Sequence, residues 1–381
     1  MAVIMGGMVF AFILILQYIG EHFSFLEAVK FAGASGKMQI VDLEPNFESR
    51  YTIWSGLTGG LFLALSYFGT DQSQVQRYIS ASSVKQSRMG LMFNAVLKIP
   101  MQFFILFTGV MLFVFYQAEK QPISFNQEVI AQVLNSDQSD KGEKLMLQFD
   151  EIQNEKNALV KSSGLDKMDE IDRLQIDQAS IKSEFNALSE SINIDVPTKD
   201  SDYVFIRFIL DYLPHGAIGL LLAVILSAAM SSTAGELNAL ATTTMNDFVK
   251  RLGNQELDER KQVLYSKLIT VGWGLLAIAF ALAANLFDNL IELVNILGSL
   301  FYGTILGIFV CAIFLKSVKA REVIIGAIVA ETLILFLFAG SHWDILPISI
   351  GFLWFNVIGC LVVIITALMV SSGGDEQMEI A

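Results

Sequence analysis

The chain alternates between long apolar runs and shorter polar stretches. A helix needs about 20 consecutive apolar residues to cross a bilayer, and several runs reach that length. The runs predict eight membrane helices, at about 2–19, 53–78, 89–116, 216–248, 264–284, 290–315, 322–340 and 348–370. Because these runs lack the alternation of barrel strands, the predicted class is an all-α polytopic membrane protein.

One long stretch, residues 117–203, interrupts this pattern and is polar and acidic. From Glu119 to Asp202 it holds 18 Asp and Glu against 9 Lys and Arg, which accounts for most of the net charge of −13. Spacings of three and four residues relate Ile171, Leu174, Gln178, Ile181, Phe185, Leu188 and Ile192. This is a heptad seam with one polar member. The pattern favours a coiled-coil hairpin inserted between membrane helices over a solvated, partly disordered loop, which the charge density also permits.

Charge distribution predicts the topology. Charged residues make up 17% of the sequence, below the roughly 25% of soluble proteins. Lys and Arg cluster in three alternating loops, at 77–88, 250–267 and 316–321. The positive-inside rule makes these loops cytoplasmic and places 117–203 outside. The expected location is a plasma membrane, the inner membrane of a bacterium, with the insert external or periplasmic. Because the chain opens directly in an apolar helix, we also expect an N-terminal truncation.

The fourth predicted helix carries a stripe of small residues that includes Ala228, Ser231 and Ser232 on one helical face. Such a stripe is more often a packing surface between helices. The functional alternative is an alkali-ion site. Na⁺ is a hard cation that prefers oxygen ligands, and the carbonyl of Ala228 with the two serine hydroxyls offers three.

The second predicted helix is weakened by Gly59, Gly60 and Gly69. Interrupted helices are where secondary transporters bind substrates, although a glycine-rich packing face is an equal alternative. Lys98 lies within the third helix, where a charge is either functional or extends toward the membrane surface. No nucleophile, phosphate loop or basic-aromatic stripe occurs, which argues against an enzyme and against nucleic-acid binding.

Two segments carry a family resemblance. FGTDQSQVQRYISASSVKQSRMGLMFNAVLKIP (68–100) and LPHGAIGLLLAVILSAAMSSTAGELNALATTTMNDF (213–248) resemble the sodium:solute symporter family, as does IIGAIV from Ile324. The resemblance covers nearly the whole chain except the acidic insert. It implies the second portion of a five-plus-five inverted-repeat (LeuT-like) transporter fold. Residues 1–116 then resemble core helices 5–7, 117–203 form the insert, 204–370 resemble core helices 8–12, and 371–381 form a cytoplasmic tail.

The resemblance implies sodium-coupled symport of a small solute by alternating access, and no enzymatic activity. Sodium, the co-transported ion, would bind the carbonyl of Ala228 and the hydroxyls of Ser231 and Ser232. The remaining ligands belong to a first core helix that this sequence lacks, so the chain alone is expected to be inactive.

The resemblance also bears on the substrate. Tyr67 and Lys98 match an inner-gate aromatic residue and a substrate-contacting lysine. Ala64 and Val294 stand where, or near where, sugar-transporting members carry Asn and Gln, which argues against a sugar. Lys98 would then face an anionic solute.

The expected partners are the lipid bilayer and this small solute. The competing interpretation is a membrane sensor or scaffold that binds an unknown partner through the external hairpin. The short segment 371–381 offers no signalling domain, which favours transport.

Overall fold

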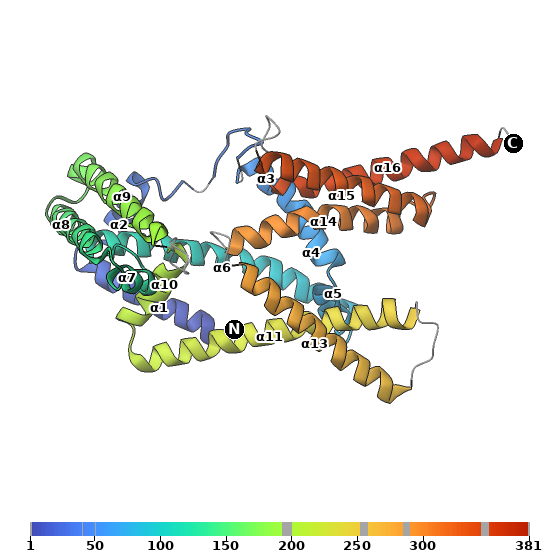
Figure 1. The fold of residues 1–381 in the computed structure, drawn as a ribbon, viewed down its shortest axis with the longest axis horizontal. Coiled ribbons are helices and arrows are strands. Elements are labelled where there is room, and N and C mark those ends of the chain that lie inside the picture. The colour runs from blue at the N-terminus through green and yellow to red at the C-terminus, as the bar shows by residue number, and fades with distance from the viewer. Residues whose placement is uncertain are drawn as a thin grey trace. The chain divides into compact units, whose positions relative to one another are not determined.

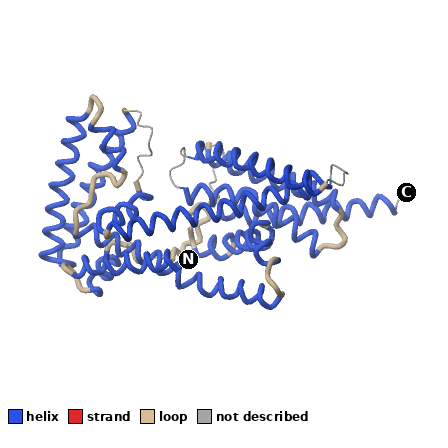
Figure 2. The backbone as a smooth tube through the Cα atoms, turned by 90° about the horizontal axis from the view of Figure 1, so that it is seen from below, coloured by secondary structure: helices blue, strands red, loops and turns tan. Residues whose placement is uncertain are grey.

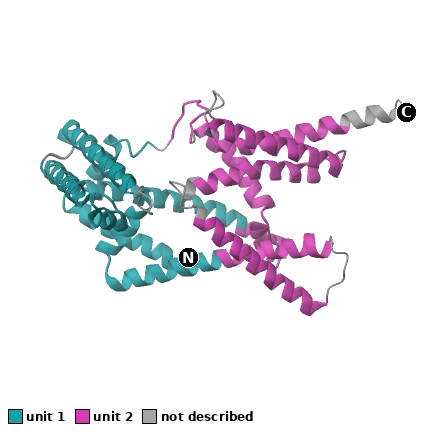
Figure 3. Ribbon diagram, in the orientation of Figure 1, with its two compact units in different colours: residues 1–40, 91–232 teal, residues 41–90, 233–381 magenta. Residues whose placement is uncertain are grey.

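The computed structural model describes residues 2–39, 41–49, 51–192, 200–251, 258–284, 290–343 and 350–379. These residues form helices and loops, with no strand among them (Figure 2). They group into two compact units, Met1–Ile40 with Leu91–Ser232 and Val41–Gly90 with Thr233–Ala381 (Figure 3). Two of the three boundaries fall inside helices, α6 (Val84–Ala118) and α11 (His215–Thr243). The predicted loop 285–289 and most of the loop 341–347 lie outside the described residues.

Within the described part of the chain, seven helices are long and apolar enough to cross a membrane (Figure 1). They are α1 (Ala2–Gly20), α6 (Val84–Ala118), α11 (His215–Thr243) with the π-helical turn η3 (Thr244–Lys250), α13 (Glu259–Ala284), α14 (Leu290–Phe314), α15 (Ala320–His342) and α16 (Leu353–Glu379). The chain is therefore a multi-pass α-helical membrane protein, as the apolar runs predict.

The predicted span 53–78 differs from a single continuous helix. It is divided into α3 (Ile53–Leu57), α4 (Gly59–Thr70) and α5 (Gln72–Ile79). Asp71 causes the second break, because its backbone is extended (φ −73°, ψ 119°) and its carboxylate accepts a hydrogen bond from the Ser73 amide at 2.9 Å. This is an N-cap, which ends one helix and starts the next.

The first unit is built on aromatic packing between α1, α6 and two short helices, α2 (Phe25–Ala34) and α10 (Val204–Tyr212). Phe115 of α6 lies edge-on to Phe208 and Tyr212 of α10, with ring centroids 5.2 and 4.9 Å apart. The sequence pattern did not predict α2, although Ser24 and Glu27 form a capping box at its start.

The acidic stretch contains α7 (Gln127–Leu134), α8 (Ser139–Ser163), the 3₁₀ turn η1 (Gly164–Lys167) and α9 (Met168–Ser191). The contacts between α8 and α9 run antiparallel. Residues Leu145 and Phe149 pack near Phe185 and Leu188 in one cluster, whereas Lys156 bonds to Gln178. Four members of the predicted seam are buried: Ile171, Gln178, Phe185 and Leu188. That this helix pair is an insert outside the membrane stays a prediction.

A polar network lies inside the α8–α9 pair. Lys156 is 1% exposed and donates to Oε1 of Gln178 at 2.5 Å. Nε2 of Gln178 donates to Gln153, which in turn donates to the carbonyls of Tyr116 and Glu119 at the end of α6. Burial lowers the pKa of Lys156 to about 8, because desolvation penalises the charged ammonium. The network joins α8 and α9 to the end of α6.

The second unit centres on a bundle of α14, α15 and α16, with α4 packed against α14 and α16. Glycines allow the backbones to approach closely. A Cβ atom on Gly303 would lie 2.5 Å from the Asn356 carbonyl oxygen, and one on Gly326 would lie 2.7 Å from that of Val363. Small residues at such contacts are what helix packing in lipid requires.

Candidate functional site

The three predicted sodium ligands lie on one turn of α11, so the structure brings them together along one helix. Ala228 is half-buried, and Ser231 and Ser232 are exposed. No group of three or more His, Cys, Asp or Glu side chains suited to a metal ion occurs among the described residues. Hydroxyl and carbonyl oxygens, which suit an alkali ion, are therefore the candidate ligands on this helix.

The break between α4 and α5 forms a second polar site, in the other unit. Ser66 is fully buried and donates to the carbonyl of Tyr302 in α14 at 2.9 Å. Thr70 donates to the Ser66 carbonyl at 2.9 Å, within the last turn of α4. These bonds fix the end of α4 against α14, so that the extended Asp71 lies beside a packed helix contact.

Tyr67, the predicted gate residue, lies within this second site. Its hydroxyl accepts a hydrogen bond from Nε2 of Gln74 at 2.8 Å, across the break. Its ring centroid lies 6.4 Å from that of Tyr302. This bond joins α4 to α5 across the break, and the gate role of Tyr67 stays a prediction.

Lys98, the predicted substrate lysine, is exposed on α6, two residues before Pro100 within the same helix. Proline removes a backbone donor and bends a helix. Lys98 belongs to the part of α6 assigned to the first unit, and Tyr67 belongs to the second. Ala64 is half-buried in α4, and Val294 is exposed on α14.

Several polar residues of the second unit were not assigned a role from the sequence. Arg77 of α5 lies 4.0 Å from Glu236 of α11. The indole of Trp273 donates to the Thr244 hydroxyl at 3.0 Å, at the start of the π-helical turn. Such turns are frequent at functional sites. Asp71 follows Gly69 and Thr70 and is a residue type that favours an N-cap, so the sequence holds a signal for the break. No local pattern indicates that Tyr302 contacts this site.

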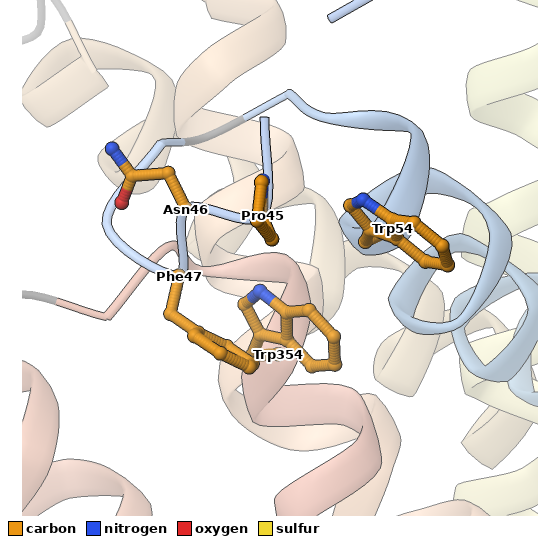
Figure 4. A pocket seen from close by; sticks show the side chains of 5 residues that line it. All are labelled: Pro45, Asn46, Phe47, Trp54 and Trp354. Carbon is orange, nitrogen blue, oxygen red and sulfur yellow. The ribbon is translucent and has the colours of Figure 1, made fainter. Parts of the chain in front are cut away.

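Two apolar pockets lie in the second unit. One, of about 310 Å³, is lined by Pro45, Asn46, Phe47, Trp54 and Trp354. Figure 4 shows the two indoles facing this space from α3 and α16, while the Asn46 amide points away. The other, of about 380 Å³, lies between α4, α14 and α16, with Gly69 and Thr70 in its wall. None of the predicted site residues lines either pocket.

Comparisons with known proteins show which family the chain is similar to. Residues 188–330 match the model of the Sodium:solute symporter family. A Sodium-dependent multivitamin transporter from Oryctolagus cuniculus is 22% identical over 316 residues, which is 81% of this chain and 38% of that protein. The Sodium/sialic acid symporter SiaT from Proteus mirabilis is 22% identical over 317 residues, 81% of this chain and 47% of that protein. The chain is therefore similar to the sodium:solute symporter family over these residues.

A further relative extends the range of substrates among these proteins. Sodium-coupled monocarboxylate transporter 2 from Mus musculus is 22% identical over 335 residues, 88% of this chain and 43% of that protein. The chain thus spans less than half the length of these curated relatives. They are transporters by name, in agreement with the prediction that the chain is not an enzyme.

The fold agrees with the family. A solved structure of a Na⁺-coupled sialic acid symporter, in a substrate-bound outward-open state, matches with a TM-score of 0.60 and 21% identity. The match covers 97% of this chain and 60% of that one. The likeness shows that this chain shares the helical fold of the solved symporter.

Proposed function

We propose that the chain is part of a sodium-coupled symporter that carries a small solute through a plasma membrane. The names of the family and of the relatives support sodium as the co-transported ion. The observation that carries the proposal is the turn of α11 that contains Ala228, Ser231 and Ser232, whose helical spacing places them toward one side of the helix. An alkali ion needs further oxygens, which would come from another helix of the complete symporter.

Sodium at this turn would favour the outward-open state and raise the affinity for the solute. Because coupling between two ligands is reciprocal, the solute would also tighten sodium binding. The α4–α5 break, with Tyr67 bonded across it to Gln74, supports a hinge at which one half-helix moves relative to the other. Transport then proceeds by alternating access within an inverted-repeat fold.

We propose that the solute is anionic. The named relatives carry sialic acid and monocarboxylates, both of which are acids. Lys98 on α6 would supply the positive charge. The α8–α9 hairpin is then an external insert whose partner is unassigned, and the loops rich in Lys and Arg face the cytoplasm.

Sodium-dependent stabilisation of the purified complete symporter, which would supply the remaining ligands, tests the ion site without requiring transport. A bound ion stabilises the folded state by about 2.7 kcal/mol at 100 times its dissociation constant. Replacing potassium by sodium should raise the melting temperature. The double variant S231A/S232A should lose this increase, and S227A, one residue before Ala228, should keep it. An equal sodium effect in all three proteins contradicts the assignment.

Uptake into proteoliposomes tests the transport function. Sialic acid, lactate and glucose should be compared, each with and without a sodium gradient. The chain alone is expected to show no uptake. The complete symporter is expected to take up the acids in a sodium-dependent way. Uptake that does not depend on sodium contradicts the proposal, and a preference for glucose contradicts the anionic solute.

A further inference from the structure

A carboxyl group lies at the middle of a membrane helix, away from the proposed sodium ligands. Glu331 is near the centre of the span Ala320–Ser341 in α15. Its Oε1 atom is inaccessible to solvent and has no hydrogen-bond partner. An ionised carboxylate in this position is costly, and a charge inside a membrane helix is a functional candidate for that reason.

A second unpartnered group lies beside it on α14. The side chain of Thr304 is adjacent to the carboxyl of Glu331, yet Oγ1 of Thr304 also has no hydrogen-bond partner. Thr304 is 6% exposed. Threonines elsewhere in these helices bond to their own backbone, as Thr332 does with the Ile328 carbonyl. Thr304 keeps its hydroxyl available for a neighbour.

The surroundings hold both groups in place. Gly359 of α16 packs against Gly303, the backbone of Thr304 and the side chain of Ile334, so the three helices meet at this level. Ala330 and Ile334, which flank Glu331 on α15, are fully buried. Glu331 is only partly buried as a residue, and this packing encloses its Oε1 atom.

No opposite charge is available at this level to neutralise a carboxylate. Within the described spans 293–314, 320–341 and 353–371, the titratable side chains away from the helix ends are Glu331, Tyr302, Cys311 and Cys360. Cys311 packs with Ala330, and Cys360 is its neighbour. Tyr302 faces Tyr67 of α4 instead. Arg321 and Glu322 lie in the first turn of α15, far along the helix from Glu331.

We propose that Glu331 and Thr304 form a proton-binding site inside the α14–α15–α16 bundle, separate from the sodium ligands on α11. One proton on the carboxyl removes the charge and supplies a hydrogen bond to the threonine oxygen. A metal cation fits less well, because a hydroxyl and one carboxyl group offer fewer oxygens than an alkali ion requires. Loss of the proton leaves a buried charge and weakens the packing of α15 on α14.

Labelling with dicyclohexylcarbodiimide tests the proposal on the unmodified protein. This apolar reagent reacts with protonated carboxyl groups inside membranes and leaves an adduct that peptide mass spectrometry locates. Glu331 should be labelled at neutral pH, whereas Glu322, at the exposed end of the same helix, should not. Above the pKa of the group, labelling should fall about tenfold for each pH unit. Labelling of Glu331 equal to that of Glu322, or independent of pH, overturns the proposal.

Two further measurements separate a proton site from a sodium site and from a carboxyl group that does not titrate. Protection of Glu331 from labelling by sodium, but not by potassium, overturns the proton assignment in favour of a sodium ligand. The variant E331Q keeps a hydrogen-bond donor for Thr304 and carries no titratable group. The melting temperature of the wild type should fall with rising pH over the range in which the folded state keeps a proton that the unfolded chain has released, and E331Q should lack this contribution. An identical pH dependence in both proteins overturns the proposal.

Discussion

The α8–α9 pair and the α14–α16 bundle both bury polar side chains, but the hydrogen bonding of these side chains differs. In the pair, Lys156, Gln178 and Gln153 bond to one another and to the end of α6, and Oδ1 of Asn186 is the one buried atom of α9 without a partner among the described residues. In the bundle, Glu331, Thr304 and Asn356 each keep an atom without a partner. A buried polar group is costly unless it is bonded. A satisfied network serves to position helices, whereas unpartnered groups at one level indicate a place for a ligand.

The largest effect is expected from breaking the satisfied network. Q178L leaves the Lys156 ammonium buried without its acceptor, which should cost about 3–5 kcal/mol. Hydrogen exchange in α8 and α9 should accelerate by about a hundredfold or more. The double variant K156M/Q178L removes both members and should recover most of the loss. Q148L, at an exposed position of α8, is the matched control. If Q178L and Q148L behave alike, the network does not hold the pair together.

A somewhat smaller effect is expected from titrating Lys156. Its pKa is lowered from the ordinary value of 10.5 to about 8 by burial. Between these two values the unfolded chain holds a proton that the folded chain has released, so stability rises with pH. The gain across the window is about 3 kcal/mol, seen as slower hydrogen exchange after correction for the intrinsic rate. K156M should lack this rise, and a rise of equal size in K156M contradicts the assignment.

The smallest of the three effects concerns the packing of the bundle itself. G303A places a Cβ 2.5 Å from the Asn356 carbonyl oxygen, where backbone must move, and should cost about 1–3 kcal/mol. G298A, on the same helix, meets a flexible Tyr302 side chain at 3.3 Å and should cost less. Thermal unfolding in detergent measures both. Equal melting temperatures of G303A and G298A would show that the close backbone contact at Gly303 does not constrain the packing of the bundle.

The long apolar helices could be predicted from the sequence because lipid imposes a minimum length on any spanning segment. The observed bounds of α1, α13 and α14 differ from the predicted ones by a few residues. Short helices such as α2 and α10 were missed, since in a polar segment an amphipathic helix of ten residues gives a weak signal. The break at Asp71 was missed because the apolar run on either side outweighed one N-cap residue.

The candidate site was predictable only where it lies on a single helix. Ala228, Ser231 and Ser232 share a face of α11 through their spacing alone. The partner of Ser66 could not be found in the same way, since Tyr302 lies 236 residues further along the chain.

By itself, the sequence determined that this protein is a helical membrane protein with one long acidic stretch, because hydrophobic length and charge act locally. Tertiary structure decided which polar groups meet: Lys156 with Gln178, Tyr67 with Gln74 across a helix break, and Glu331 with Thr304. Periodicity specifies the face of a helix and not the helix that covers it. That choice depends on backbone approach at residues such as Gly303 and Gly359, where helix packing brings distant segments together.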